Sequence, residues 1–140
     1  MANGDAVAFT STINTYFGAK YGGRYTGIIY NNQMDDFSTP GSANSFGYQP
    51  TAANFIRPGK RPMSSMSPTI VIDRKTREAK LVVGASGGSR IITAVAQVAI
   101  KALWMGLDIK DAIDDRRVHH QLYPTSVDFE QGFDSVNIYI

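Results

Sequence analysis

Two adjacent glycines, Gly87 and Gly88, lie between a predicted strand and a predicted helix, where backbone N–H groups can do chemistry. Glycine lets the backbone approach a bound group closely, and N–H groups at a helix N-terminus bind anions or a developing oxyanion. A phosphate-binding loop is not indicated, because no Gly-Lys-Ser/Thr sequence follows to contact the outer phosphates. The glycine pair therefore indicates either an oxyanion site or a tight strand-to-helix turn.

A second group of polar side chains begins with Asn31-Asn32-Gln33 and ends with Asp35 and Asp36, beside a predicted strand end. Carboxylates at such an exit suit an ammonium group or a metal ion. Because adjacent side chains of an extended chain point in opposite directions, only one of the two aspartates can easily face a site. A solvated turn has the same composition, so both interpretations stay open.

Serines and histidines give weaker signals. Ser64 and Ser65, in a proline-flanked loop, could bind a carboxylate through hydroxyl and backbone donors, although serines are common in loops. The only histidines, His119 and His120, are neighbours, and neighbouring side chains on a helix diverge by ~100°. We therefore expect structural hydrogen bonds rather than a metal site. No His, Ser and Asp occur at a spacing that singles out a catalytic triad.

Strands, a hairpin and a long loop must position these residues. The segments Ala6–Ile13 and Gly27–Tyr30 are typical of short strands. The segments Thr69–Asp73 and Lys80–Gly84 predict a hairpin that turns at 74–78. The intervening stretch Gln33–Pro68 holds five of the six prolines and predicts a long loop, of the kind that often forms a lid.

Two helices follow the glycine pair. The first ends at Gly106 and has an apolar face with helical spacing: Ile91, Ile92, Val95, Val98, Ala99, Ala102 and Leu103. Asp108 is expected to cap the second helix, whose inward residues are Ile109, Ala112 and Ile113. A last strand is expected at Ser126–Phe129. The predicted fold class is α+β.

Composition excludes several classes of protein. The sequence has 140 residues, enough for one domain, and its 43% hydrophobic and 19% charged residues are typical of a globular chain. A net charge of +2 is too small to indicate a nucleic-acid partner. The absence of cysteine excludes disulfides, a thiol nucleophile and cysteine-ligated metals. No apolar run reaches the roughly 18 residues of a membrane span, and no targeting signal is visible, so we expect no membrane contact from this segment.

Taken together, the motifs resemble the small subunit of γ-glutamyltransferase, also called γ-glutamyltranspeptidase or glutathione hydrolase, from about Asn3 to Pro124. The motifs, in chain order, are Ser11-Thr12-Ile13-Asn14 with Tyr16-Phe17-Gly18, then Asn31-Asn32-Gln33-Met34-Asp35-Asp36-Phe37, Pro58-Gly59-Lys60-Arg61-Pro62 leading into Ser64-Ser65-Met66-Ser67-Pro68-Thr69-Ile70, Gly84-Ala85-Ser86-Gly87-Gly88, and His119-His120-Gln121. The resemblance implies part of an N-terminal-nucleophile hydrolase fold, a four-layer αββα sandwich. In that family a precursor cuts itself into large and small subunits.

The family chemistry is acyl transfer without a cofactor. The N-terminal threonine of the small subunit attacks the γ-glutamyl amide of glutathione or a related compound. The acyl group then passes to water, an amino acid or a dipeptide. For this chain the resemblance implies glutathione and γ-glutamyl compounds as substrates and a large subunit as partner.

The resemblance also assigns roles to individual residues. Thr12 corresponds to a second threonine that contacts the substrate and orients the nucleophile, and the groups around the substrate α-ammonium are Asn14, Gln33 and Asp36. The hydroxyls of Ser64 and Ser65 correspond to those on the α-carboxylate. Gly87 and Gly88 correspond to the oxyanion donors, Gly88 also contacting substrate, and Phe46 to an aromatic residue in a lid within Gly41–Asn54. Some members have Glu where this chain has Gln33, so its site is expected to be less negative than theirs.

The sequence also departs from the family pattern. Nothing before Thr12 matches the context of the nucleophile, which belongs on the preceding strand, and the carboxylate-binding arginine belongs to the large subunit. We therefore expect residues 1–140 to be a small-subunit region truncated at both ends and inactive in isolation. The alternative is a non-catalytic truncated paralogue that binds γ-glutamyl ligands or pairs with a large subunit. The full-length enzyme is expected to be extracellular, cell-surface or periplasmic.

Overall fold

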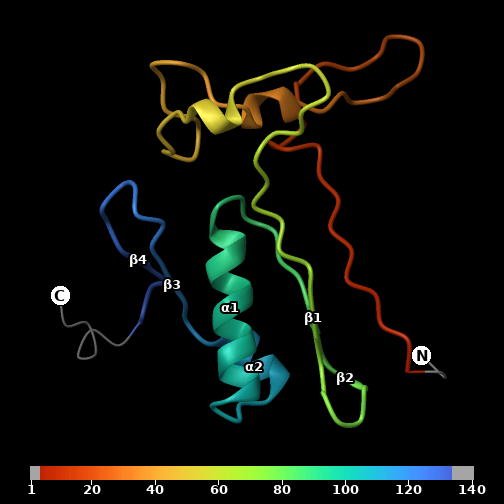
Figure 1. The fold of residues 1–140 in the computed structure, drawn as a ribbon, viewed down its shortest axis with the longest axis vertical. Helices are drawn as coiled ribbons and strands as arrows, with labels where there is room; N and C mark the ends of the chain where they lie inside the picture. Colours follow the sequence, from red (N-terminus) through yellow and green to blue (C-terminus); the bar gives the residue numbers. More distant parts are fainter. Residues whose placement is uncertain (1–3, 134–140) are drawn as a thin grey trace. The chain divides into compact units, whose positions relative to one another are not determined.

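The computed structural model describes residues 4–133, which fall into two compact units. One unit comprises Ser11–Ser64, and the other combines the residues before it with those after it. The unit outside Ser11–Ser64 contains every helix and strand that is labelled in Figure 1. Each unit is described separately below.

The predicted hairpin is confirmed. Strands β1 (Thr69–Ile72) and β2 (Ala79–Val83) pair antiparallel. The turn between them is closed by Asp73, whose Oδ1 accepts the N–H groups of Lys75 at 2.8 Å and Thr76 at 3.0 Å. Such a turn satisfies its own backbone donors, so it needs no support from the rest of the unit.

Helix α1 (Arg90–Leu103) packs one apolar stripe against this hairpin. Ile91, Val95 and Val98 are buried, as is Leu81 of β2. The apolar face is narrower than the sequence predicts, because Ile92 is 52% exposed. Each residue advances ~100° around a helix, so Ile92 rotates away from the buried stripe.

Helix α2 (Ile109–Asp114) begins at the predicted N-cap, where Asp108 Oδ1 accepts the Lys110 N–H at 2.9 Å. Its Ala112 is fully buried, but Ile109 and Ile113 are 44% and 47% exposed, so the prediction that both face inward is wrong. A six-residue helix presents few positions to its neighbour α1, and the small side chain of Ala112 permits close approach.

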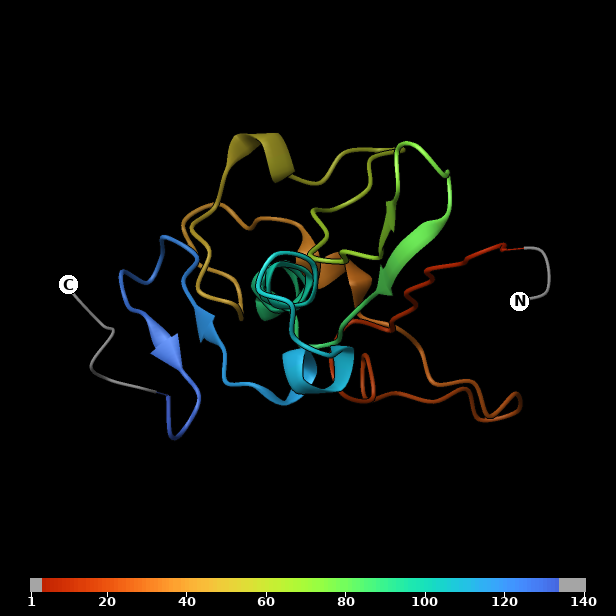
Figure 2. The same ribbon diagram turned by 90° about the horizontal axis from the view of Figure 1, so that it is seen from below.

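A second hairpin lies on another side of α1, which Figure 2 shows nearly end-on. Strands β3 (Val118–His119) and β4 (Asp128–Phe129) pair antiparallel, so the strand expected at Ser126–Phe129 is present but shorter. Gln97 of α1 attaches this hairpin to the helix: its Nε2 donates to Val118 O at 2.7 Å, and its Oε1 accepts the Val118 N–H at 2.9 Å.

Two predicted strands are wrong. Within 4–133, neither Ala6–Ile13 nor Gly27–Tyr30 forms a strand, and the latter contributes only the isolated bridge between Gly22 and Ile29. Val7 and Phe9 are 70% and 85% exposed. Their residue types suit a pleated surface, but a strand also requires a partner that supplies backbone hydrogen bonds.

The unit Ser11–Ser64 has little regular structure, as the loop predicted at Gln33–Pro68 implies for its second half. It contains two 3₁₀ turns, η1 (Gln33–Asp36) and η2 (Ala52–Asn54), and no buried hydrophobic side chain among its described residues. Asparagine side chains stabilise it instead, including Asn32, whose Oδ1 accepts from Thr15 N at 3.1 Å and Thr15 Oγ1 at 3.0 Å. No helix in the described part of the chain is long and apolar enough to cross a membrane.

Candidate functional site

Gln33 and Asp36 lie on one side of the turn η1. Residues three apart are aligned in a 3₁₀ helix, and Gln33 Nε2 donates to Asp36 Oδ2 at 3.1 Å. Asp36 is half-buried, whereas Asp35 is exposed. Asp36 is therefore the more buried of the two aspartates, and they lie in a 3₁₀ turn rather than in the extended backbone expected from the sequence.

The pKa of Asp36 is raised above its usual value. Burial is the largest cause, and the neighbouring carboxylate of Asp35 adds to it. Hydrogen bonds from the side chains of Asn14 and Gln33 lower the pKa without cancelling these effects. A cation placed beside Asp36 would therefore be stabilised, since it would neutralise a carboxylate that is costly to keep charged.

Gln33 presents a second acceptor next to this carboxylate. Its Oε1 is buried and has no hydrogen-bond partner among the described residues. A buried acceptor without a donor is costly, by about 1–3 kcal/mol. An N–H group from a ligand would remove that cost if a local shift of the side chain exposed this atom.

Asn14 and Thr12 are tied to the same region of this unit. Asn14 adopts a left-handed backbone conformation with φ 77°, its N–H donates to Thr12 Oγ1 at 2.8 Å, and its Nδ2 donates to Asn32 O at 3.1 Å. Short polar side chains are the ones that tolerate this conformation. The structure thus brings Thr12 and Asn14 to the segment that holds Gln33 and Asp36.

Asn54 is a buried polar residue that no motif in the sequence singles out. Its side chain is hydrogen-bonded to the backbone of Asp36 and to that of Met63, which directly precedes Ser64. Among many loop asparagines, nothing in its neighbours Ala53 and Phe55 marks it. Only the folded structure identifies the segments that it joins.

The predicted lid is locally folded around Asn44. Asn44 Oδ1 accepts the N–H groups of Phe46 and Tyr48, both at 3.0 Å, and Phe46 is half-buried. This asparagine-closed turn fixes the backbone on either side of Phe46. Its role as a lid stays a prediction.

Gly87 and Gly88 form the predicted strand-to-helix turn. Their φ angles are 141° and 59°, and their carbonyls accept the N–H groups of Arg90 and Ile91, both at 3.2 Å. Neither glycine N–H has a hydrogen-bond acceptor among the described residues. The turn therefore also presents free donors at a helix N-terminus, where negative charge is stabilised.

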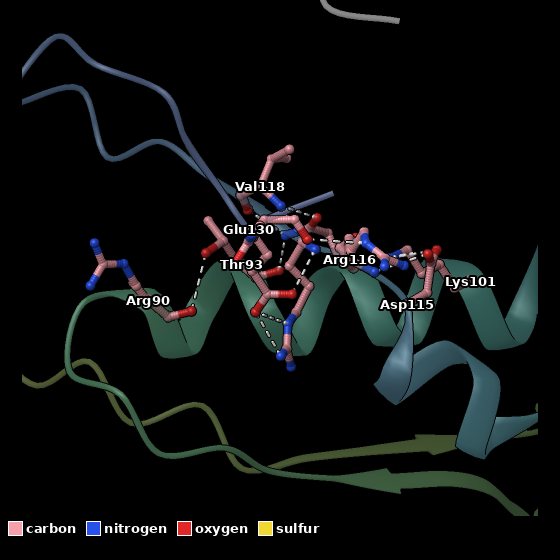
Figure 3. Close-up of polar contacts among 10 residues, drawn as sticks. Arg90, Thr93, Lys101, Asp115, Arg116, Val118 and Glu130 are labelled. Carbon is pink, nitrogen blue, oxygen red and sulfur yellow. Dashed lines mark hydrogen bonds and ion pairs between the residues drawn. The ribbon is translucent and has the colours of Figure 1, made fainter. Parts of the chain in front are cut away.

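A cavity of about 390 Å³ adjoins Gly87 over the N-terminal half of α1. Arg90 pairs with Asp128 at 2.6 Å and Arg117 with Glu130 at 2.8 Å, so the charged groups that line the cavity are paired with each other. Figure 3 shows Arg90, Thr93, Val118 and Glu130 gathered along this part of the helix.

The histidines make structural hydrogen bonds, as expected. His119 is buried between Thr93 Oγ1, 2.8 Å from its Nδ1, and Gln121 Oε1, 2.9 Å from its Nε2. His120 Nδ1 lies 3.0 Å from Ser126 O. Both residues hold the hairpin of β3 and β4 and its flanking loop.

The candidate residues divide between the two units. Thr12, Asn14, Gln33, Asp36, Phe46 and Ser64 belong to one, and Ser65, Gly87 and Gly88 belong to the other. Ser64 is exposed and Ser65 half-buried. Within the first unit, hydrogen bonds join the surroundings of Gln33 and Asp36 to Asn14 and, through Asn54, to the residue preceding Ser64.

Comparison with known proteins gives consistent matches. The model of the Gamma-glutamyltranspeptidase family matches residues 1–138. The chain is 48% identical over 136 residues to a glutathione hydrolase proenzyme of Arthroderma benhamiae, covering 97% of the chain and 23% of that protein. It is 47% identical over 128 residues to the putative inactive glutathione hydrolase 4 of Arabidopsis thaliana, covering 90% of the chain and 66% of that protein.

A solved structure is also similar. A crystal structure of a mutant Helicobacter pylori gamma-glutamyltranspeptidase matches with a TM-score of 0.84 and 43% identity, covering 89% of this chain and 66% of that one. The chain thus spans less than a quarter of the fungal relative, about two thirds of the Arabidopsis relative and about two thirds of the matched chain in the Helicobacter structure.

Proposed function

We propose that the chain binds the γ-glutamyl group of glutathione and related compounds for acyl transfer or hydrolysis. The chain belongs to the γ-glutamyltranspeptidase family. It shares that family's N-terminal-nucleophile hydrolase fold as a partial α+β domain. The observation that carries the proposal is the buried, unpartnered Gln33 Oε1 beside the carboxylate of Asp36.

The α-ammonium group of a γ-glutamyl compound fits these acceptors. An ammonium has three N–H donors, and Asp36 and Gln33 offer carboxylate and amide oxygens within one turn of the chain. Burial and Asp35 raise the pKa of Asp36, so binding a cation there relieves an existing electrostatic cost. Asn14 completes the proposed ammonium site.

The remaining candidate residues supply the other contacts of the reaction. Ser64 and Ser65 are proposed to bind the α-carboxylate. The N–H groups of Gly87 and Gly88 are proposed to stabilise the tetrahedral oxyanion, and losing one such donor typically lowers the rate by about 10²–10³-fold. Thr12 is proposed to orient the nucleophile through its hydroxyl group.

The nucleophile itself is proposed to lie outside these 140 residues. Thr10 and Thr12 are internal, so neither has a free α-amine to act as its own base. We propose that the nucleophilic threonine and a carboxylate-binding arginine come from the rest of a longer precursor, including its large subunit. Water, amino acids or dipeptides would accept the acyl group outside the cytoplasm.

A second candidate function is ligand binding without catalysis. It is favoured by the similarity to a relative named as a putative inactive glutathione hydrolase, two thirds of which the chain spans. Both candidates share the proposed γ-glutamyl site. They differ in whether the protein releases the leaving group.

Release of a chromophore from a γ-glutamyl anilide separates these functions. The 140-residue chain should release none, and the full product of its gene should release it. Turnover by the isolated chain would assign the nucleophile to an internal residue such as Thr12 and overturn our placement of it. Binding of γ-glutamyl ligands without turnover by the full gene product would support the non-catalytic candidate.

A further inference from the structure

Asn54 joins the two sides of the proposed γ-glutamyl site. We propose that it is a positioning residue that fixes the spacing between the ammonium-binding segment at Asp36 and the carboxylate-binding segment at Ser64. This inference rests on the proposed function and adds a residue to it. Asn54 itself need not touch the substrate.

The contacts of Asn54 use both ends of its amide. Its Nδ2 donates to Asp36 O at 2.8 Å and to Ser38 Oγ at 3.2 Å, and its Oδ1 accepts the Met63 N–H at 2.9 Å. A backbone carbonyl only accepts and a backbone N–H only donates, so these partners determine which end of the amide is which. The residue is 8% exposed.

The backbone of Asn54 reinforces the same connection. Its carbonyl accepts the Ser38 N–H at 3.0 Å, and Ser38 pairs with Phe55 in an isolated parallel bridge. The segment that ends η1 is therefore held against η2 by main chain as well as side chain. The Met63 N–H, by contrast, donates to the side chain of Asn54 and not to main chain.

A fixed spacing matters because the substrate's two charged groups share one carbon atom. An α-ammonium and an α-carboxylate can bind together only when their sites lie at the matching separation. In the unit Ser11–Ser64 no described hydrophobic side chain is buried, so this separation is not set by a hydrophobic core of the unit's own. A buried amide with partners on both sides can set it, since a lost partner would leave a buried polar group unsatisfied.

Three variants isolate the role of Asn54. Asn54→Ala removes both connections. Asn54→Asp keeps the shape and the acceptor for Met63 but loses the donors to Asp36 and Ser38, and it is the alternative if the alanine variant does not fold. Thr51→Ala is the matched control, because Thr51 precedes the same short turn, is exposed and makes no side-chain cap bond.

The measurement is binding of three probes by titration calorimetry to the full gene product that contains this chain. L-Glutamate carries both charged groups, glutarate lacks the ammonium, and 4-aminobutanoate lacks the α-carboxylate. In Asn54→Ala we expect L-glutamate to bind about tenfold more weakly, the equivalent of one lost buried hydrogen bond. Each single-group probe should weaken by less than about threefold, because only simultaneous binding depends on the spacing.

The ratio of L-glutamate affinity to single-group affinity is decisive in either Asn54 variant. A fall in this ratio, with Thr51→Ala unchanged, supports the positioning role. If the wild type binds L-glutamate and the ratio is unchanged, or if all three probes weaken equally as in general destabilisation, the inference is wrong while the proposed function stands. If the wild type binds none of the probes, the proposed function and this inference fail together.

For an active gene product, steady-state kinetics provide a second readout. Asn54→Ala should raise KM for a γ-glutamyl anilide about tenfold and leave kcat within about threefold, because ground-state binding of the glutamyl group is what is lost. A fall in kcat with unchanged KM would contradict a positioning role toward the glutamyl group.

Discussion

Asp36 is half-buried next to the exposed Asp35. Burial raises the pKa of the Asp36 carboxyl above its usual 3.8, and the charge of Asp35 raises it further. A folded state with a raised carboxyl pKa binds the proton more tightly than the unfolded chain. The resulting stabilisation is complete below the unfolded pKa and is lost as pH rises through the folded pKa. At neutral pH, keeping Asp36 ionised therefore costs some stability, which a bound cation would restore in the proposed site.

Asp36→Asn should separate these two effects. It should weaken binding of a γ-glutamyl ligand by ~1.5–3 kcal/mol, the range for hydrogen bonds to charged groups. The free energy of unfolding near neutral pH should be unchanged or rise by about 0.5 kcal/mol. Calorimetry and denaturant titrations from about pH 3 to about pH 7 measure both. Unchanged affinity would remove Asp36 from the site, and a strong loss of stability would contradict the sign of its pKa shift.

A substitution at Gly87 tests whether the turn before α1 requires glycine. Its φ of 141° is one that residues with a side chain rarely adopt, although an added Cβ would meet only Arg90 Cβ at 3.9 Å. Gly87→Ala should lower the free energy of unfolding by about 1–3 kcal/mol through backbone strain rather than steric overlap. Gly84→Ala is the control, since Gly84 lies outside the positive-φ region and its Cβ would stand 3.9 Å from Thr10 Oγ1. Equal denaturation curves for the two variants would refute this account.

At the scale of elements, α1 offers a matched pair of isoleucines. Ile91 is 7% exposed and Ile92 is 52% exposed. Ile91→Ala should lower the free energy of unfolding by about 2–5 kcal/mol, because it removes buried atoms and leaves a cavity. Ile92→Ala should cost about 1 kcal/mol or less, since most of its surface is already in water. Thermal or denaturant unfolding gives the comparison, and equal losses would mean that the buried stripe is misplaced.

The sequence predicts most successfully the elements that depend on residues close together in the chain. The hairpin of β1 and β2, the helix α1 and the Asp108 cap each depend on spacing or on one side chain. The strand expected at Ala6–Ile13 depends on a partner that the sequence does not specify, and the inward faces of Ile109 and Ile113 depend on how much of α2 its neighbour covers.

In the candidate site too, features that depend on neighbouring residues are predicted and features that depend on distant partners are not. The sequence predicts Gln33 and Asp36 as site residues, but it does not predict the 3₁₀ turn through which the structure joins them. Asn54 was missed because its importance lies in partners 9 and 18 residues away. A buried amide of this kind has no sequence motif.

The two units of the molecule differ in what stabilises them. Every buried hydrophobic side chain of the described residues, Leu81, Ile91, Val95, Val98 and Ala112, belongs to the unit that contains α1. The unit Ser11–Ser64 relies on hydrogen bonds of asparagine side chains and turns. Regions with few buried apolar contacts open locally at low free-energy cost.

Hydrogen exchange should reveal this difference. In the isolated chain, backbone amides of Ser11–Ser64 should exchange at least about tenfold faster than those in the middle of α1, because their opening exposes little apolar surface. Mass spectrometry of exchanged peptides measures both units in one sample. Equal protection would indicate a cooperative core that includes Ser11–Ser64, and binding of L-glutamate should slow exchange mainly in that unit.

The self-contained turn between β1 and β2 makes the molecule convenient to label. Asp73 satisfies the backbone donors of the turn, and Lys75 is exposed at its tip. This turn lies at one end of β2, and Gly87 follows the other end. The sequence contains no cysteine, so Lys75→Cys would introduce a single thiol among these 140 residues. A fluorophore attached there would report unfolding of the unit that contains α1 without altering any residue of the proposed site.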